Sequence, residues 1–242
     1  MTVTWEELGW ERLAAGVGRC RLPRWDCTTG LVVGEGTALL IDAGSSLAEG
    51  ARLRTEAQDL AGHRVTHLAL THPHFDHVLG VAAFAGAEVY GAVGIDTVLD
   101  GRHAREELRA DAVGNGLDAR VAEEAVDALV PPRHHVSGEW TLDLGGGRQV
   151  LLANVGPGHS AHDLAVLVPG SPEVVFCGDL VEESGEPQAA SDAVPSQWPT
   201  ALDRLLDLGG EDALYVPGHG AVVDAGFVRR QRDELAARFG VS

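Results

Sequence analysis

Six consecutive residues, His72-Pro73-His74-Phe75-Asp76-His77, carry three imidazoles and one carboxylate. Imidazole and carboxylate ligands together suit zinc, and also iron or manganese. The proline argues against a helix, and an extended backbone would place His72, His74 and Asp76 on one side. His72 and His74 can then bind one metal ion, while Asp76 and His77, after a turn, reach a second. Because the chain has only 11 histidines in 242 residues, chance does not explain this spacing.

Side chains of the same kinds also follow apolar segments elsewhere. Functional groups of α/β proteins collect just past the carboxyl ends of strands, and glycines permit tight backbone paths there. A single Gly-His or Gly-Asp is more often an ordinary turn. Repetition at five expected strand ends instead indicates one shared site. The five residues are Asp42, His72, His159, Asp179 and His219.

The run at 72–77 resembles the H-x-H-x-D-H signature of the metallo-β-lactamase-fold hydrolases. Three later segments resemble the other metal motifs of that superfamily, in the expected order, and Asp42-Ala43-Gly44 resembles its first Asp-x-Gly motif. The three are Gly158-His159-Ser160, Gly178-Asp179 and Pro217-Gly218-His219-Gly220. The resemblance implies an α/β fold of four layers, an αββα sandwich. Two mixed β-sheets would be flanked by helices, with the site at one edge.

The resemblance also implies a binuclear ligand set of the glyoxalase II and lactonase type. Two divalent ions are expected, with zinc favoured and iron or manganese as alternatives. Two ions about 3.5–4 Å apart can share a hydroxide and polarise a carbonyl group. We also expect Asp76 to pass a proton to the leaving group. The implied ligands are His72, His74 and His159 for the first ion, Asp76, His77 and His219 for the second, and Asp179 between them.

Two further residues are candidates for supporting roles. Asp42 is expected to be either a hydrogen-bond acceptor for a ligand imidazole or loop, or an ordinary turn residue. His162, three positions after His159, is a candidate for contact with substrate or an oxyanion. The commoner interpretation of His162 is a solvated histidine or one that supports a ligand.

The bulk composition limits the partners. A formal net charge of −18 at pH 7 disfavours nucleic acid and anionic membrane surfaces. Three cysteines argue against a disulfide framework, and the first residues lack a signal-peptide pattern. No apolar run approaches the ~20 residues needed to span a bilayer. We expect a cytoplasmic protein with a small-molecule substrate, no nucleic-acid partner and no membrane partner; a homodimer stays open.

The apolar periodicity predicts the elements that position these residues. A β-hairpin is expected at 31–33 and 38–41, a helix at 46–61, and a buried strand at 65–70 that leads into the metal run. The chain before about Cys27 is expected to be irregular. Other strands are expected at 88–91, 141–144, 149–155, 164–168, 174–177 and 213–216, and other helices at 78–85, 95–130, 198–208 and 224–239. Residues 1–242 would form a single metallo-β-lactamase-fold domain, with the helical segment 95–130 over the active site.

The favoured function is a binuclear hydrolase that cleaves an ester, thioester, lactone or similar carbonyl substrate. β-Lactam hydrolysis is disfavoured, because within the superfamily that the chain resembles the true zinc β-lactamases usually carry Cys or Ser where this chain has Asp179. The alternative is an iron-dependent oxidoreductase with oxygen or sulfur chemistry, although the di-iron members usually carry Glu where this chain has His74. A non-catalytic metal-binding protein is a third hypothesis. It is disfavoured because four ligands would already close a structural site.

Overall fold

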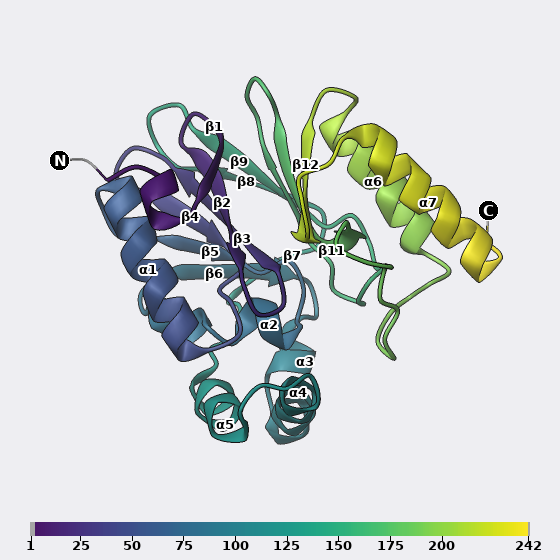
Figure 1. Ribbon diagram of the computed structural model, residues 1–242, viewed down its shortest axis with the longest axis horizontal. Coiled ribbons are helices and arrows are strands. Elements are labelled where there is room, and N and C mark those ends of the chain that lie inside the picture. Colours follow the sequence, from purple (N-terminus) through teal and green to yellow (C-terminus); the bar gives the residue numbers. More distant parts are fainter. Residues whose placement is uncertain (1–2, 242) are drawn as a thin grey trace.

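The computed structural model describes residues 3–241, and Figure 1 shows strands packed between helices. Met1, Thr2 and Ser242 of the predicted domain lie outside the described residues. The strands form two halves of a mixed sheet, the first from the N-terminal part of the chain and the second from the C-terminal part. Within residues 3–241, no helix is both long enough and apolar enough to cross a membrane.

Within residues 3–241, the first half of the sheet contains seven strands. They are β1 (Glu11–Ala14), β2 (Val17–Leu22), β3 (Cys27–Val33), β4 (Ala38–Ile41), β5 (His67–Ala69), β6 (Glu88–Ala92) and β7 (His134–Val136). β1 to β4 pair antiparallel in chain order, and β4 to β7 are parallel neighbours. Parallel neighbours need crossover connections, and α1 (Leu47–Ala61) supplies the one between β4 and β5.

In the described part of the chain, the second half of the sheet contains five strands. They are β8 (Glu139–Asp143), β9 (Gln149–Ala153), β10 (Ala165–Val168), β11 (Val174–Glu182) and β12 (Leu214–His219). β8 to β11 pair antiparallel in chain order, and β12 is parallel to β11. The helices α6 (Trp198–Gly209) and α7 (Ala225–Phe239) pack together on the outer face of this half (Figure 1).

Three separate apolar cores show that the molecule has four layers. Successive strand residues point to opposite faces, so Leu40 packs toward α1 while its neighbour Leu39 packs between the two halves. In β11, Phe176 packs between the halves and Val175 packs toward α6 and α7. The predicted αββα sandwich is therefore confirmed. The two halves are also joined edge to edge, through a single pair between Cys27 of β3 and His219 of β12.

The predicted helix at 46–61 is confirmed as α1, and its ends have local causes. Ser46 accepts a hydrogen bond from the backbone N–H of Glu49 at 3.2 Å, which is a typical N-cap. Gly62 closes the helix in the left-handed conformation, with φ of 75°. Segment 95–130 is helical as predicted, and its α4 packs against α2 (Phe75–Val78) beneath the metal run. The segment contains α3 (Asp96–Leu99), α4 (Arg102–Gly114) and α5 (Ala119–Ala128).

The prediction of an irregular N-terminal stretch is wrong. A 3-10 turn at Glu6–Leu8 precedes β1 and β2, which extend the first half of the sheet. The arginines in β2 interrupt its apolar pattern, so the sequence pattern did not predict this strand. Arg19 is nevertheless buried, because it pairs with Glu11 at 2.7 Å and donates to the carbonyl of Gly220 at 2.8 Å.

The metal run is only partly extended, which corrects two predictions. His74 is extended, with φ of −78° and ψ of 151°, but the next residues form the short helix α2. Asp76 and His77 therefore lie on a helical turn, and Asp76 does not share a strand face with His72. The predicted helix at 78–85 is replaced by α2 and a 3-10 turn at Val81–Phe84. The chain turns directly after His74, where His77 donates its backbone N–H to the carbonyl of His74.

Candidate metal centre

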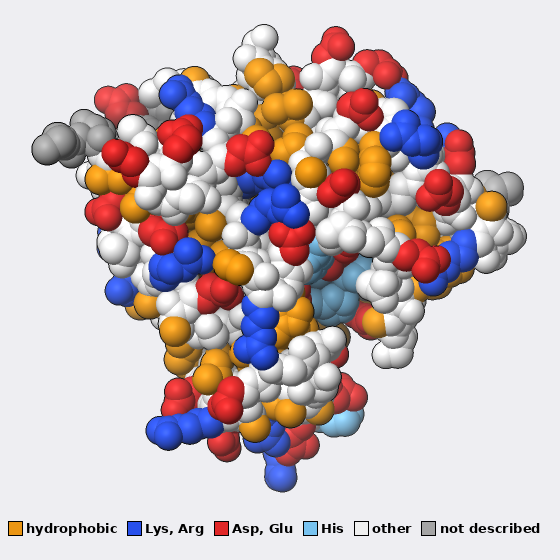
Figure 2. Space-filling view, in the orientation of Figure 1, with side chains coloured by type: hydrophobic (Ala, Val, Ile, Leu, Met, Phe, Trp, Pro, Cys, Tyr) orange, Lys and Arg blue, Asp and Glu red, His pale blue; other side chains and the backbone are white. Residues whose placement is uncertain are grey.

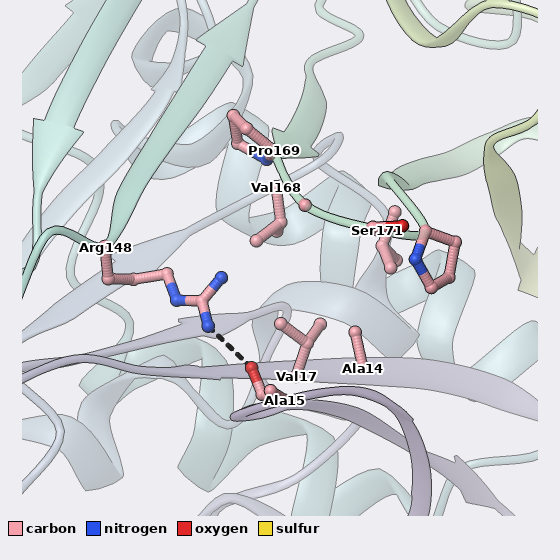
Figure 3. Close-up of a pocket in the computed structure, with 10 residues that line it drawn as sticks. Ala14, Ala15, Val17, Arg148, Val168, Pro169 and Ser171 are labelled. Atoms are coloured by element: carbon pink, nitrogen blue, oxygen red, sulfur yellow. Dashed lines mark hydrogen bonds between the residues drawn. The ribbon is translucent and has the colours of Figure 1, made fainter.

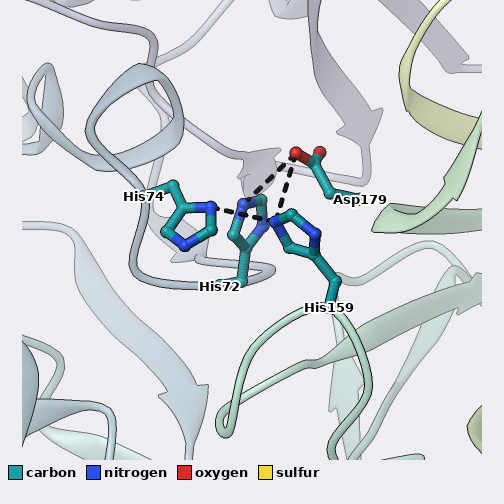
Figure 4. Close-up of side chains that lie close together, drawn as sticks. All are labelled: His72, His74, His159 and Asp179. Carbon is teal, nitrogen blue, oxygen red and sulfur yellow. Dashed lines mark hydrogen bonds and ion pairs between the residues drawn. The ribbon is translucent and has the colours of Figure 1, made fainter. Parts of the chain in front are cut away.

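Four of the predicted ligands meet at the end of β5, and Figure 4 shows them together. One ligand atom from each of His72, His74, His159 and Asp179 lies within 4.8 Å of the others. His74 Nδ1 is 2.9 Å from His159 Nε2. Asp179 Oδ2 is 3.6 Å from His72 Nε2 and 3.5 Å from His159 Nε2. The three imidazoles and the carboxylate thus surround a single point.

A second group adjoins the first and shares Asp179 with it. Asp179 Oδ1 is 3.2 Å from His77 Nε2, and Oδ2 is 3.2 Å from His219 Nε2. Asp76 Oδ2 completes this group, 3.4 Å from His219 Nε2 and 3.7 Å from His77 Nε2. All seven residues that the sequence predicted as ligands therefore converge, and Asp179 lies between the two groups.

The two groups lie on the line where the halves of the sheet meet. The first half contributes the run at 72–77, while the second half contributes His159 from the β9–β10 connection, Asp179 from β11 and His219 from β12. Asp179 and His219 lie inside their strands rather than after them, since both strands are longer than predicted. Figure 2 shows histidine side chains in a hollow at the centre of the displayed face.

Glycine makes room for the shared carboxylate. A Cβ atom at Gly218 would lie 1.8 Å from Asp179 Oδ1 and 2.8 Å from the carbonyl carbon of Gly178. Any larger residue at position 218 would therefore displace Asp179. Gly178 itself has a φ of +53°, a conformation that L-residues with side chains rarely adopt.

Each of the five imidazoles is oriented by a hydrogen bond from its outer nitrogen. His77 Nδ1 donates to Asp42 Oδ2 at 2.8 Å, and His74 Nε2 is 2.9 Å from Asp192 Oδ2. Such outer partners fix the tautomer, so that the other ring nitrogen is free for a metal. The remaining bonds run from His72 Nδ1 to Thr71 Oγ1 (2.9 Å), from His159 Nδ1 to the Gln188 carbonyl (3.1 Å) and from His219 Nδ1 to the Trp25 carbonyl (2.7 Å).

Asp42 is a hydrogen-bond acceptor for a histidine and a loop, the first of the two alternatives that the sequence left open. It is buried, and its carboxylate accepts from the backbone N–H of Thr71 at 2.8 Å, from the Thr71 hydroxyl at 2.7 Å and from His77. His162, by contrast, lies outside both groups, with Nδ1 3.0 Å from the carbonyl of Val93. Asp42 is therefore hydrogen-bonded to one of the imidazoles predicted as ligands, whereas His162 is not.

Sequence reasoning missed three contributors to the site. Asp192 lies in the long β11–α6 connection without a recognisable motif, and the carbonyl of Trp25 has no sequence signature. Cys27 is the third, with Sγ 3.6 Å from both ring nitrogens of His77. Two equal distances place the sulfur over the face of the ring rather than in line with either nitrogen.

The charges of three of the predicted ligands, His72, His159 and Asp179, suit ligation. Burial lowers the pKa of His159 to about 4 and that of His72 well below its ordinary value. Both rings are therefore neutral at pH 7, as ligation requires. Burial opposes ionisation of Asp179, but the imidazoles of His72, His77 and His219 outweigh it and hold the pKa of this carboxyl well below its usual range.

Two buried polar atoms show that the site fits a cation. Among the described residues, His72 Nε2 and Asp179 Oδ1 have no hydrogen-bond partner. Leaving a buried polar group unpaired costs about 1–3 kcal/mol, so native proteins rarely do it without a reason. Both atoms point into the two ligand groups, where a divalent cation would satisfy them.

A separate cavity of about 120 Å³ contains none of these residues (Figure 3). Its lining includes Val17, Val168 and Pro169, with Arg148 as the charged member. Arg148 Nη2 donates to the carbonyl of Ala15 at 2.6 Å, so this guanidinium already has a partner. The cavity therefore has no part in the metal centre.

An αββα sandwich with imidazoles and carboxylates gathered where its sheets meet defines a class of metal-binding α/β proteins. The sequence profile of the metallo-beta-lactamase superfamily matches residues 22–219. The chain belongs to this superfamily, and the predicted resemblance is confirmed.

Two curated relatives are similar to the chain. Metallo-beta-lactamase domain-containing protein 1 of Xenopus laevis is 27% identical over 197 residues, which are 81% of this chain and 71% of the relative. Metallo-beta-lactamase type 2 of Bacillus cereus is 24% identical over 174 residues, which are 71% of this chain and 58% of that protein.

Solved structures share the fold. A metallo-beta-lactamase from Pontibacter korlensis aligns with a TM-score of 0.72 at 20% identity, covering 93% of this chain and 97% of the other. The mono-zinc form of FIM-1 from Pseudomonas aeruginosa aligns with a TM-score of 0.69 at 20% identity, covering 95% of each chain. At these identities the similarity shows the fold alone.

Proposed function

We propose that the protein is a binuclear metal-dependent hydrolase that cleaves an ester, thioester, lactone or similar carbonyl compound. The observation that carries this proposal is the sharing of Asp179 by two adjoining groups of inward-facing ligand atoms. A structural metal site is closed by four ligands and has no need of a second group beside it.

The residues divide into two ligand sets. When bound, two divalent ions, with zinc favoured, would supply hydroxide at neutral pH and a Lewis acid for the carbonyl oxygen. Asp179 would contact both ions, and its low pKa keeps it ionised for that role. His72, His74 and His159 would hold the first ion, and Asp76, His77 and His219 would hold the second.

We assign Asp76 a second role, as the group that passes a proton to the leaving group. Its side chain is buried, and its Oδ2 lies in the second ligand group, 3.4 Å from His219 Nε2. A carboxylate in this position is within reach of a substrate atom bound between the two ligand sets. Hydrogen-bond reach is the first requirement for a general acid or base.

Metal content is the direct test of the proposal. Protein purified without chelators is expected to contain about two zinc per chain and to hydrolyse members of an ester, thioester and lactone panel. His74→Ala is expected to lose both turnover and metal, since His74 Nδ1 faces His159 Nε2 at 2.9 Å. His103→Ala, on the exposed face of α4, is the matched control.

The elemental result discriminates among the hypotheses. Iron as the bound metal would favour the oxidoreductase and call for oxygen-uptake assays. Failure to bind any metal, even after reconstitution, would contradict the proposal. A chromogenic β-lactam belongs in the panel because one of the relatives is a metallo-beta-lactamase type 2. We expect turnover of it to be slower than that of the best ester or lactone.

The affinity for the second ion is expected to rise with pH. Burial lowers the pKa of His219, but the charge of Asp179 outweighs it and raises the pKa to about 9. His219 is therefore protonated at pH 7 and must release its proton when it binds a metal. Burial also opposes protonation of His77, a ligand of the same ion, but its neighbours, including Cys27 and Asp179, raise its pKa well above the ordinary value. Affinity should therefore increase at least tenfold per pH unit between pH 7 and 9. Competition against a chromophoric chelator measures this slope, and a flat profile between pH 7 and 9 would contradict the prediction.

A further inference from the structure

The turn between β2 and β3 reaches the metal centre through its backbone. Leu22 of β2 pairs with Cys27 of β3, so residues 23–26 form the connection. Within it, the carbonyl of Trp25 accepts the hydrogen bond from His219 Nδ1 at 2.7 Å. This carbonyl is the atom that leaves His219 Nε2 free to face Asp179.

Asp26 has the backbone conformation that directs this carbonyl. Its φ is +59°, one of two positive values for residues other than glycine in the described chain. The peptide plane between residues 25 and 26 turns with ψ of the first residue and φ of the second. If φ of Asp26 became negative, the plane would flip and turn the N–H of Asp26, a donor, toward His219. Asp tolerates the left-handed region better than most residues, and β-branched residues tolerate it poorly.

Side-chain contacts hold this turn in place. Asp26 accepts two bonds from Arg21, at 2.7 Å from Nε and 2.5 Å from Nη2, a bidentate pair of fixed geometry. Trp25 packs edge-on against Phe75 of α2, with ring centroids 5.1 Å apart. In Figure 1 the turn accordingly lies beside α2.

The helical segment provides further anchors for the turn. The indole Nε1 of Trp25 donates to the carbonyl of Asn115 at 3.3 Å, and Arg24 donates to the carbonyl of Gly116. Both acceptors lie in the connection between α4 and α5. The turn therefore has fixed contacts on the side of the helices as well as on the side of His219.

We propose that Asp26 is a positioning residue for His219. Its left-handed backbone turns the Trp25 carbonyl toward Nδ1, which selects the imidazole tautomer whose Nε2 faces the site. The inference deepens the proposed function and rests on it in one respect, because His219 Nε2 would bind the second metal ion of that proposal. The tautomer itself is a property of the protein that can be measured without added metal.

The test compares substitutions that differ in their tolerance of positive φ. Asp26→Gly and Asp26→Asn accept the left-handed conformation, and Asp26→Val does not. In Asp26→Val we expect His219 to lose its Nδ1–H tautomer, seen by ¹⁵N NMR of the metal-free protein at a pH above 9. We also expect the second Zn²⁺ to bind about 10–100-fold more weakly, with the first unchanged. Asp26→Gly and Asp26→Asn should keep both properties within a factor of about three.

The outcomes separate this inference from the proposed function. If Asp26→Val keeps both the tautomer and the affinity, the inference is wrong. Equal losses in all three variants would also overturn it, because the carboxylate and not the backbone would then matter. If Asp26→Val shifts the tautomer but the unsubstituted protein binds no Zn²⁺, the positioning role stands and the proposed function fails. Thermal unfolding of the metal-free variants shows whether Asp26→Val still folds. Asp26→Ala, which disfavours positive φ less strongly than valine, provides a milder second variant with the same expected direction.

Discussion

Replacement of Asp179 by asparagine is expected to lower kcat/KM by about 10³-fold or more and to leave at most one ion per chain. Loss of one oxyanion donor alone costs about 10²–10³ in other hydrolases, and Asp179 serves both ligand groups. An amide has one oxygen and no charge, so it cannot face His77 and His219 in the same way. Steady-state kinetics and elemental analysis of the same preparation measure the two effects.

The fold should survive this substitution. Asparagine has the shape of aspartate, and without the carboxylate the pKa of His219 returns toward its ordinary value, so no buried charge is left unpaired. Circular dichroism in the presence of a chelator should therefore match that of the unsubstituted protein. Asp207→Asn, on the exposed face of α6, provides the matched control. Full activity in Asp179→Asn would contradict the assignment of Asp179 to both ions.

Replacement of Asp42 by alanine is expected to cost stability as well as metal affinity. Asp42 accepts three buried hydrogen bonds, from the backbone and hydroxyl of Thr71 and from His77. Buried donors left unpaired cost about 1–3 kcal/mol each, so the free energy of unfolding should fall by about 3 kcal/mol or more. The affinity for the second ion should fall about 10–100-fold, because His77 loses its orienting acceptor. Urea unfolding with chelator present, followed by metal competition, measures both.

Asp42→Gly separates the side chain from the backbone. Asp42 has a φ of 60°, which glycine adopts freely and alanine does not. The glycine variant should therefore be more stable than the alanine variant, by about 1–2 kcal/mol, and should bind the second ion equally weakly. Behaviour like the unsubstituted protein in Asp42→Gly would show that the three hydrogen bonds contribute little.

Much of the fold was predictable because its signals are local. The helix at Leu47–Ala61 has an apolar face and a capping serine, and the buried strand before His72 is a continuous apolar segment. The seven candidate ligands were predictable because a dense ligand run, together with its repeated Gly-His and Gly-Asp partners, matches a specific superfamily signature. The structure brings all seven together.

The residues that orient the ligands were not predictable, for physical reasons. Backbone carbonyls such as those of Trp25 and Gln188 are present at every position, so no residue type marks the ones that accept from a histidine. Asp192 is one of many acids, and only the path of the β11–α6 connection brings it to His74. The arginines of β2 concealed a strand, since the ion pair that permits burial of Arg19 depends on tertiary contacts.

Among the described residues, the two halves share one backbone pair, Cys27 with His219, and otherwise pack through apolar side chains. The metal centre would add a further link between them. The N-terminal and C-terminal halves each supply part of the ligand set, and neither half alone would present a complete one. An ion that binds only the docked halves stabilises their docking by RT ln(1 + [M]/Kd), about 2.7 kcal/mol when free metal is 100 times Kd. A bound ion would then strengthen the docking of the N-terminal half against the C-terminal half. Loss of the ion would therefore weaken this docking and abolish catalytic activity together.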